Sequence, residues 1–278
     1  MSFNNDNTRF FKHILAAALL LAGWPASARA VNIVMSGTNQ TSEQPLISFI
    51  QDNFSNVNLT YGDFSNYVTH AAAIQAADLF IVGRQVSSGA YGNAANSASF
   101  NALTVPVVSF TSFVSRPDGN RWGWHAGGIS PPLATVGAET TITAAGAAVL
   151  GSAAGTYDWY PEPDLFNAGG TGAVGGGEIL ATMGGDILVA HWNAGALSGT
   201  EATFGSERLL FNSDQADVGG ATVLPTGAGR QALINALDAY TPLTAIPEPT
   251  SLALAGVIAC GAGMARRRSR SAAAVGRC

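Results

Sequence analysis

Residues 77–91 read ADLFIVGRQVSSGAY, and this stretch decides the fold. It holds a continuous apolar run, Leu79 to Val82, followed directly by Gly83, Arg84 and, after two residues, a pair of serines. A short strand that is apolar on both faces is typical of a parallel sheet, because helices then cover both of its sides. The stretch therefore predicts a buried parallel strand inside an α/β domain.

The flanking segments alternate between strand and helix patterns. Thr41-Ser42-Glu43-Gln44 is a capping box that predicts a helix with Thr41 as its cap. Further strands are expected at 31–35, 57–61, 105–110 and 208–211, helices at 42–54, 70–77, 93–103 and 230–240, and a hairpin at 178–192 around Gly184-Gly185. Between 126 and 177 the pattern weakens. This order predicts one doubly wound α/β domain over residues 31–243 with a mostly parallel sheet.

Charge is distributed unevenly along the chain. Residues 31–246 carry 16 acidic residues against five arginines and no lysine, a formal charge near −11, whereas both ends of the chain are basic. A body without a polycationic surface is a poor partner for phosphate backbones, so nucleic-acid binding is not expected. The two cysteines, Cys260 and Cys278, lie beyond the body, which therefore has no internal disulfide or thiolate metal site.

The N-terminal segment, residues 1–30, has the three parts of a secretory signal peptide. Arg9 and Lys12 precede a short apolar stretch, and Ala28-Arg29-Ala30 supplies an A-x-A cleavage site. Cleavage after Ala30 would leave Val31 as the new N-terminus. The sequence therefore predicts export, with a buried N-terminal helix as the alternative.

The C-terminal segment has an apolar run over 251–265, followed by a basic tail over 266–278. Extended to Thr250, the run reaches about 24 Å as a helix, which is short of the roughly 30 Å hydrocarbon core of a bilayer. The arginines of the tail would lie on the cytoplasmic side and leave the body outside. Both ends of the chain thus predict the same topology.

Pro247-Glu248-Pro249 stands in a linker, 244–250, directly before this apolar run and Arg266-Arg267-Arg268. The three parts in this order resemble the PEP-CTERM protein-sorting signal. The resemblance covers about 25 residues. It implies a protein exported through the inner membrane of a Gram-negative bacterium, anchored transiently, processed by an exosortase and located in the envelope or outside the cell, where such bacteria often make exopolysaccharide. A second Pro-Glu-Pro, 161–163, has no apolar run after it and is interpreted as a chance match.

The body itself resembles flavodoxin-like domains, and most of all the class I glutamine amidotransferase-like group that includes trehalose-utilisation-type proteins. The likeness is one of element order over residues 31–240, with the stretch 77–91 after a third strand and a late block of hairpin, strand and helix, and it implies a three-layer sandwich. Amidotransferase chemistry needs a nucleophilic cysteine on the turn after the third strand, where this chain has Gly83-Arg84-Gln85. That activity is therefore not expected.

The ends of the predicted strands hold the candidate site residues, because open parallel sheets bind ligands beyond the carboxyl ends of their strands. Ser87 or Ser88 could act as a nucleophile with His125 or His191 as base, but no G-x-S-x-G elbow is present and both serines suit ordinary turn roles. Residues 36–43, SGTNQTSE, resemble a flavodoxin phosphate loop, and an ordinary helix start explains the same residues. The ligand-binding candidates are Ser36, Thr38, Arg84, Ser87, Ser88, Arg121, Trp124 and His125.

No metal or cofactor is expected. His70, His125 and His191 have no companion at ligand spacing, and the acidic groups Asp158, Glu162, Asp164 and Asp214, Asp217 lack EF-hand spacing and suit solvated loops. RWGWH, residues 121–125, is an unusual aromatic cluster. It could bind sugar rings, but the favoured interpretation places a tryptophan in the core while Arg121 pairs with Asp118.

Together these features predict an envelope or matrix protein that binds rather than catalyses, with polysaccharide as a candidate ligand. The competing hypothesis is a carbohydrate-active hydrolase or isomerase with its site at the carboxyl edge of the sheet. The two differ in whether an acid and a base converge there, and spacing along the sequence locates no such pair.

Overall fold

The computed structural model describes residues 29–129, 139–160, 169–213 and 220–246, and the backbone alone of 133–134, 166–167 and 214–215. The predicted signal peptide up to Ala28 lies outside these residues. So do the sorting motif, the 251–265 segment and the arginines that follow. No described helix is long and apolar enough to cross a membrane.

A nine-stranded sheet organises the body, in the order β2-β1-β3-β4-β11-β10-β9-β6-β7. Its first five strands are parallel to one another: β2 (Val57–Gly62), β1 (Val31–Ser36), β3 (Leu79–Val82), β4 (Val107–Ser109) and β11 (Arg208–Phe211). The other four pair antiparallel: β10 (Asp186–Trp192), β9 (Glu178–Met183), β6 (Thr140–Ile142) and β7 (Gly155–Tyr157). The sheet is therefore mixed, with a parallel half and an antiparallel half.

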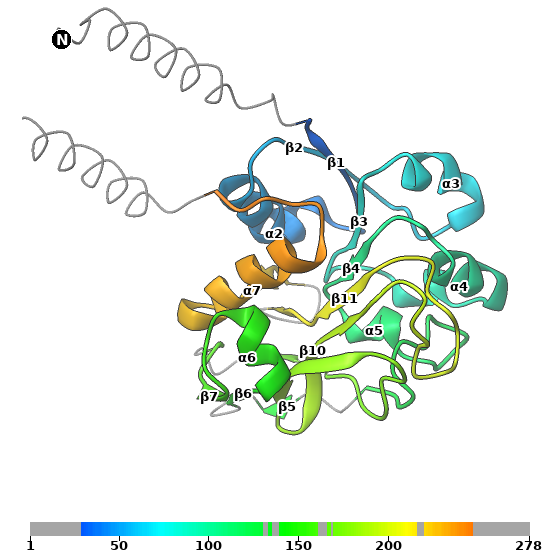
Figure 1. Cartoon of the computed structure of the whole chain (residues 1–278). Helices are drawn as coiled ribbons and strands as arrows, with labels where there is room; N and C mark the ends of the chain where they lie inside the picture. The colour runs from blue at the N-terminus through cyan, green and yellow to red at the C-terminus, as the bar shows by residue number, and fades with distance from the viewer. Residues whose placement is uncertain are drawn as a thin grey trace, which may run out of the picture. The chain divides into compact units, whose positions relative to one another are not determined.

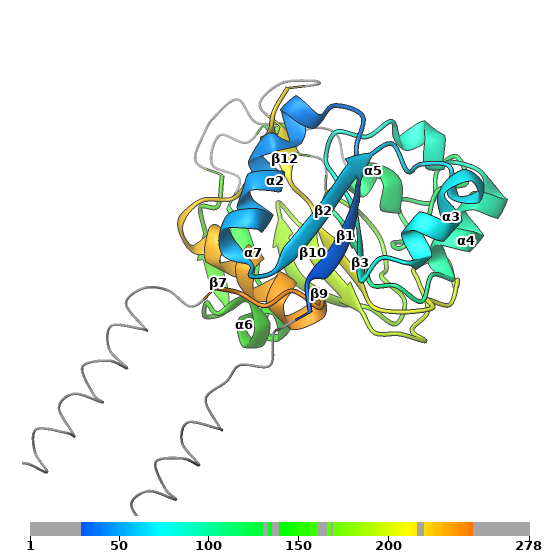
Figure 2. The same cartoon turned by 90° about the horizontal axis from the view of Figure 1, so that it is seen from above.

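A second, small sheet has the order β13-β12-β8-β5. Its strands are two residues each: β13 (Thr222–Val223), β12 (Asp214–Gln215), β8 (Phe166–Asn167) and β5 (Leu133–Ala134). In Figure 2 β12 lies beside the beginning of α2 (Gln40–Asn53).

Helices cover both faces of the large sheet (Figure 1). One face carries α2, α6 (Ala144–Leu150) and α7 (Gly227–Tyr240). The other carries α3 (Tyr67–Gln75), α4 (Ala94–Asn101), α5 (Ser112–Ser115) and the 3₁₀ turn η1 (Ser88–Tyr91).

The strands supply a separate apolar core to each face. In β3, Leu79 and Ile81 pack with α2 and α7, whereas Phe80 and Val82 pack with α3 and α4. All four residues are fully buried. Alternate side chains of a strand point to opposite faces, so a strand between two helical layers must be apolar throughout. The buried parallel strand predicted at 79–82 is confirmed.

The predicted α/β class and the 178–192 hairpin are confirmed, and one local expectation is wrong. The cap of α2 is Asn39 and not Thr41, because the Asn39 side chain accepts a hydrogen bond from the Ser42 amide. The weakly patterned region 126–177 contains β6, α6 and β7. α6 escaped prediction because its Ala-Ala-Gly-Ala-Ala sequence has no apolar periodicity. Thr143, which caps it, and Gly151, with φ of 73°, define its ends instead.

The two edges of the parallel half carry different parts of the chain. The segments after β1, β3, β4 and β11 leave at the carboxyl edge, near α5 and β12 at the upper end of Figure 2. The beginning of β1 and the segment after α7 lie at the opposite, amino edge.

Candidate functional site

The carboxyl edge gathers most of the predicted site residues, beginning with the end of β1. Ser36 is buried, and its Oγ accepts hydrogen bonds from the Phe64 amide at 2.9 Å and from the Tyr91 hydroxyl at 2.6 Å. Exposed Thr38 donates its hydroxyl to the Gln85 carbonyl at 3.0 Å. Ser36 thus connects the end of β1 to Phe64 and Tyr91 inside the protein. Thr38 connects the loop after β1 to the loop after β3.

A buried carboxyl group lies under the turn that follows β3. Glu43, on α2, accepts hydrogen bonds from the Gln85 amide and from Thr222 Oγ1, the latter at 2.7 Å. Burial raises the pKa of Glu43, against these hydrogen bonds and nearby Arg84, which lower it. A side chain at Gly83 would place its Cβ 2.2 Å from Glu43 Oε1, so glycine leaves room for the carboxyl group. Glu43 therefore joins three segments at this edge.

Arg84 is buried on the same turn. Its Nε donates to the Ser213 carbonyl, which follows β11, at 3.0 Å, and its guanidinium lies 5.2 Å from the centre of the Phe113 ring on α5. Arg116 approaches the same ring at 5.6 Å. Two guanidinium groups therefore contact one half-buried aromatic ring.

Ser87 and Ser88 begin the 3₁₀ turn that follows. Ser87 is exposed, and its side chain does not cap η1. Ser88 contacts Arg121, whose Nε donates to the Ser88 carbonyl at 3.0 Å and whose Nη2 donates to Ser88 Oγ at 3.3 Å. Arg121 Nη1 donates to the backbone carbonyl of Asp118 at 2.7 Å, so the expected Arg121–Asp118 contact exists but is made with the main chain.

Arg121 also lines a cavity of about 240 Å³ at the beginning of α4. The other lining residues are small or polar: Ala94, Ser97, Pro117, Asn120, Gly123 and Thr200. Drug-sized ligands occupy pockets of about 300–1,000 Å³, so this space suits a single small group.

His125 pairs with a serine, but with Ser115 rather than Ser87 or Ser88. Its Nδ1 lies 2.8 Å from the Gly127 carbonyl and 3.2 Å from the Thr171 carbonyl, so Nδ1 carries the proton and Nε2 accepts from Ser115 Oγ at 3.2 Å. Burial lowers the pKa of His125, partly opposed by the two carbonyls. Nucleophile, base and orienting groups are in the order that a serine hydrolase needs, yet both side chains are 0% exposed.

Trp124 and Trp122 lie in the core, as the favoured interpretation of RWGWH states. The Trp124 ring packs against Trp122, Trp192 and Phe204 with ring centres 5.3–5.9 Å apart, and its Nε1 donates to Asn101. With an exposed fraction of 0%, this ring offers no face to a ligand.

The remaining histidines have structural contacts. His70 packs edge-on against Phe64, and His191 hydrogen-bonds Glu207 at 2.8 Å while stacking on Tyr240. Within the described residues, no three His, Cys, Asp or Glu side chains are grouped as metal ligands. Of the two acidic groups considered for calcium, Glu162, Asp164 and Asp217 lie outside the described residues.

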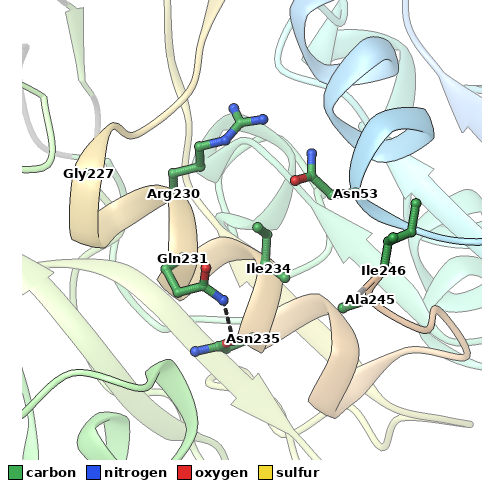
Figure 3. A pocket seen from close by; sticks show the side chains of 8 residues that line it. All are labelled: Asn53, Gly227, Arg230, Gln231, Ile234, Asn235, Ala245 and Ile246. Carbon is green, nitrogen blue, oxygen red and sulfur yellow. Dashed lines mark hydrogen bonds between the residues drawn. The ribbon is translucent and has the colours of Figure 1, made fainter. Parts of the chain in front are cut away.

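A cavity of about 400 Å³ lies between the first half of α7, the last residue of α2 and residues 245–246 (Figure 3). Asn53, Arg230, Ile234 and Ile246 line it. A further lining pair, Gln231 and Asn235, is joined by a hydrogen bond of 2.9 Å. Asn235 and Asn53 also donate to the carbonyls of Leu150 and Phe49. The side-chain amides of Asn53, Gln231 and Asn235 already make hydrogen bonds within the body. We therefore interpret this cavity as a junction between α7, α2 and residues 245–246.

Several residues at the carboxyl edge were not singled out as ligand-binding candidates, above all Glu43, Phe113, Ser115 and Arg116. A signal existed for Glu43, which shares the buried face of α2 with Leu46, Ile47 and Ile50. A carboxylate at such a position must find partners. No comparable periodic signal marks the others.

Comparison with models of known protein families gives no match to this chain, and a search of curated proteins gives none either.

Proposed function

We propose that the protein is exported, held at the inner membrane by its C-terminal segment until an exosortase-type enzyme processes it there, and presents the carboxyl edge of a flavodoxin-like body as a binding surface. The PEP-CTERM resemblance supplies the first part of this proposal. The positions of the two ends of the body support the second.

Both ends of the body form hydrogen bonds to residues 53–56, which connect α2 to β2. This is the observation on which the proposal rests. The Val31 amide donates to the Asn56 carbonyl at 2.8 Å. The Ser55 amide donates to the Thr244 carbonyl at 3.1 Å, and the Ile246 amide to the Asn53 carbonyl at 2.8 Å. The residue exposed by signal cleavage and the residue before Pro247 therefore leave the body at the same, amino edge.

In this proposal, the shared exit of the two ends would orient the body at a membrane. Only residues 247–250 separate Ile246 from the predicted apolar segment, and four extended residues span at most about 14 Å. The amino edge would face the bilayer closely, and the carboxyl edge with Arg84, Phe113 and Arg121 would face away. Ligands outside the membrane would then reach the carboxyl edge.

The chemistry of the carboxyl edge favours binding over catalysis. The acid–base group with productive geometry, Ser115 with His125, is closed to solvent, and Glu43 is fully buried. The accessible polar groups include those of Thr38, Ser87, Asp118 and, in part, Arg116 and Arg121. These groups suit hydrogen bonding to a ligand, and polysaccharide is the candidate that agrees with the matrix location.

Cell fractionation and mass measurement test the sorting half of the proposal. Glu248→Gln, or deletion of 252–270, should change the processed mass or the retention of the protein in the membrane fraction. Glu162→Gln, in the second Pro-Glu-Pro, is the matched control and should process normally. Unchanged fractionation and mass in the Glu248→Gln and deletion variants would reject the sorting role.

A serine hydrolase is the second candidate, and the 3.2 Å Ser115–His125 contact is the observation that favours it. A fluorophosphonate probe labels activated serines. We expect no labelling of the folded protein, because Ser115 is buried. Labelling that disappears in Ser115→Ala would replace the binding proposal with an enzymatic one.

A further inference from the structure

The last described residues of the body line the 400 Å³ cavity between α7 and α2. Ile246 lies on it together with Arg230 and Ile234 of α7 (Figure 3). Ile246 is 48% exposed and Ile234 is half-buried, so part of the apolar lining is open. The Ile246 amide donates to the Asn53 carbonyl at 2.8 Å, which fixes the chain beside the cavity. The residues that follow Ile246 therefore start at this cavity.

Arg230 brings a positive charge to the cavity. Its side chain is exposed, and the guanidinium lies 4.8 Å from the centre of the Phe49 ring. No carboxylate of the described residues lies within ion-pair distance of it. The amide side chains that share the cavity are neutral and bond to one another or to backbone carbonyls. A carboxylate that entered the cavity would therefore meet a cation without an ion pair in the described part of the chain.

Glu248 is the first charged residue beyond Ile246 and stands only two positions along the chain. Two extended residues span at most about 7 Å, so its carboxylate is tethered to the rim of the cavity that Arg230 lines. Tethering matters because an exposed ion pair favours the paired state by only about fivefold or less. A separate acidic molecule gains too little from such a pair, whereas a segment of the same chain has a high effective concentration. Reach and charge together single out Glu248 as the occupant.

The prolines on either side of Glu248 favour this docking. A residue before proline is restricted to extended backbone, so Pro249 limits the conformations of Glu248, and Pro247 has a fixed φ of its own. The segment therefore loses less conformational entropy on binding than an ordinary chain end. The two proline rings are apolar and suit the open sides of Ile234 and Ile246.

We propose that the sorting motif, Pro247-Glu248-Pro249, docks on the body that carries it, with the Glu248 carboxylate paired to Arg230 and the proline rings against the apolar lining of the cavity. A docked motif is withheld from the exosortase-type enzyme, so processing proceeds through the undocked form. Because the pairing is weak, the motif undocks readily. This inference rests on the proposed sorting function and adds a regulatory step to it.

Carboxyl footprinting of the full-length purified chain in detergent tests the docking. A carbodiimide with glycine ethyl ester labels accessible carboxylates, and mass spectrometry measures the labelling rate of each. We expect Arg230→Gln to raise the rate at Glu248 about two- to fivefold, because the partner of the carboxylate is lost. High salt should have the same effect on the wild type without any substitution. All rates are taken relative to Glu162, in the second Pro-Glu-Pro, as the internal reference.

Arg116→Gln is the matched control, since it removes an arginine from the opposite edge of the sheet and should leave the rate at Glu248 unchanged. Equal rates at Glu248 in the wild type and Arg230→Gln would overturn the docking, and so would equal increases in Arg230→Gln and Arg116→Gln. Arg230→Lys keeps the positive charge and should be labelled more slowly than Arg230→Gln. Equal labelling of these two variants would show that no ion pair holds the motif.

Pulse–chase labelling in cells tests the regulatory step. The half-time of processing should shorten about two- to fivefold in Arg230→Gln, because a larger fraction of the chain is undocked, and should not change in Arg116→Gln. Unchanged processing of Arg230→Gln would overturn the regulatory step. Slower processing would overturn it too, because the body would then present the motif rather than withhold it.

Failure of this inference is distinguishable from failure of the proposed function, because footprinting uses purified protein and needs no exosortase. Equal labelling of Glu248 in the wild type and Arg230→Gln, together with a processing defect in Glu248→Gln, rejects the docking alone. Faster labelling in Arg230→Gln together with normal processing of Glu248→Gln rejects the sorting role and the regulatory step but supports the docking.

Discussion

The two edges of the parallel sheet use arginine in opposite ways. At the amino edge Arg208, the first residue of β11, is completely buried, and its two terminal nitrogens donate to Ser206 Oγ and to five backbone carbonyls, those of Phe100, Asn101, Leu103, Val105 and Glu207. At the carboxyl edge Arg116 is partly exposed and has the long Asp118 contact and the Phe113 ring as neighbours.

The difference shows that an arginine can be fully enclosed by carbonyl groups at one edge of the sheet and remain partly exposed at the other. Two of the carbonyls bound by Arg208 are the last of α4, where a positive charge also stabilises the helix dipole. Burial lowers the pKa of Arg208 to about 9, so the side chain stays charged at neutral pH. The hydrogen bonds of its terminal nitrogens are satisfied inside the protein. Among the described residues, the terminal nitrogens of Arg116 have only the 3.9 Å contact with Asp118.

The largest expected effect is the loss of stability in Arg208→Met. This change leaves several buried carbonyls without donors and should lower the free energy of unfolding by about 3 kcal/mol or more. Urea unfolding followed by circular dichroism measures it. Arg230→Met is the matched control and should cost less than about 1 kcal/mol. A comparable loss in Arg116→Gln would break the comparison, because Arg116 would then be structural as well.

Gly83→Ala should have the next largest effect, because it crowds the carboxyl edge. The new Cβ would lie 2.2 Å from Glu43 Oε1 and would displace the carboxyl group from Gln85 and Thr222. Overpacking of this kind costs about 1–3 kcal/mol. In a Glu43→Ala background the clash is absent, so the double-mutant cycle should show coupling of about 0.5 kcal/mol or more. Additive losses would show that Gly83 is needed for another reason.

Glu43→Gln should change the pH dependence of stability. Burial raises the pKa of Glu43 in the folded protein above its ordinary value of 4.5, so the folded chain keeps a proton that the unfolded chain has released. The free energy of unfolding therefore falls as pH rises from 4.5 through the folded-state pKa. The Glu43→Gln variant has no proton to release at this position. Its free energy of unfolding should therefore increase relative to that of the wild type as pH rises across this range. Urea unfolding at a series of pH values measures the difference, and parallel curves would refute it.

The smallest effect is expected for Asp238→Ala at the amino edge. Asp238 Oδ1 accepts a hydrogen bond of 2.9 Å from the Ala245 amide, at an exposed position just before the sorting motif. Global stability should change by less than about 0.5 kcal/mol. Exchange of the Ala245 amide with solvent should accelerate, and it should not do so in Asp52→Ala, which removes an exposed carboxylate from α2. Equal exchange in both variants would show that the Phe54–Ala245 pairing alone holds the chain.

Much of the parallel half could be predicted, because its strands are apolar on both faces and its helices have periodic apolar residues. The antiparallel additions β6 and β7 could not, since their short strands carry little apolar pattern. Among site residues, Arg84, Ser88 and Arg121 were chosen for their place after strands, and the fold brings Ser88 and Arg121 into contact. The pairing of Ser115 with His125 was not predicted, because ten residues separate them in the sequence and only the turn after α5 brings them together.

The sequence by itself determined the α/β class, the acidic body with basic ends, and the three-part tail that predicts export and sorting. Each of these depends on local composition or on spacing along one segment. Tertiary structure alone decided that Trp124 is core, that His125 meets Ser115, that both ends of the body share one loop, and that Arg84 and Arg116 contact the same Phe113 ring. These are contacts between segments distant in sequence, fixed by strand order and packing, and no local pattern encodes them.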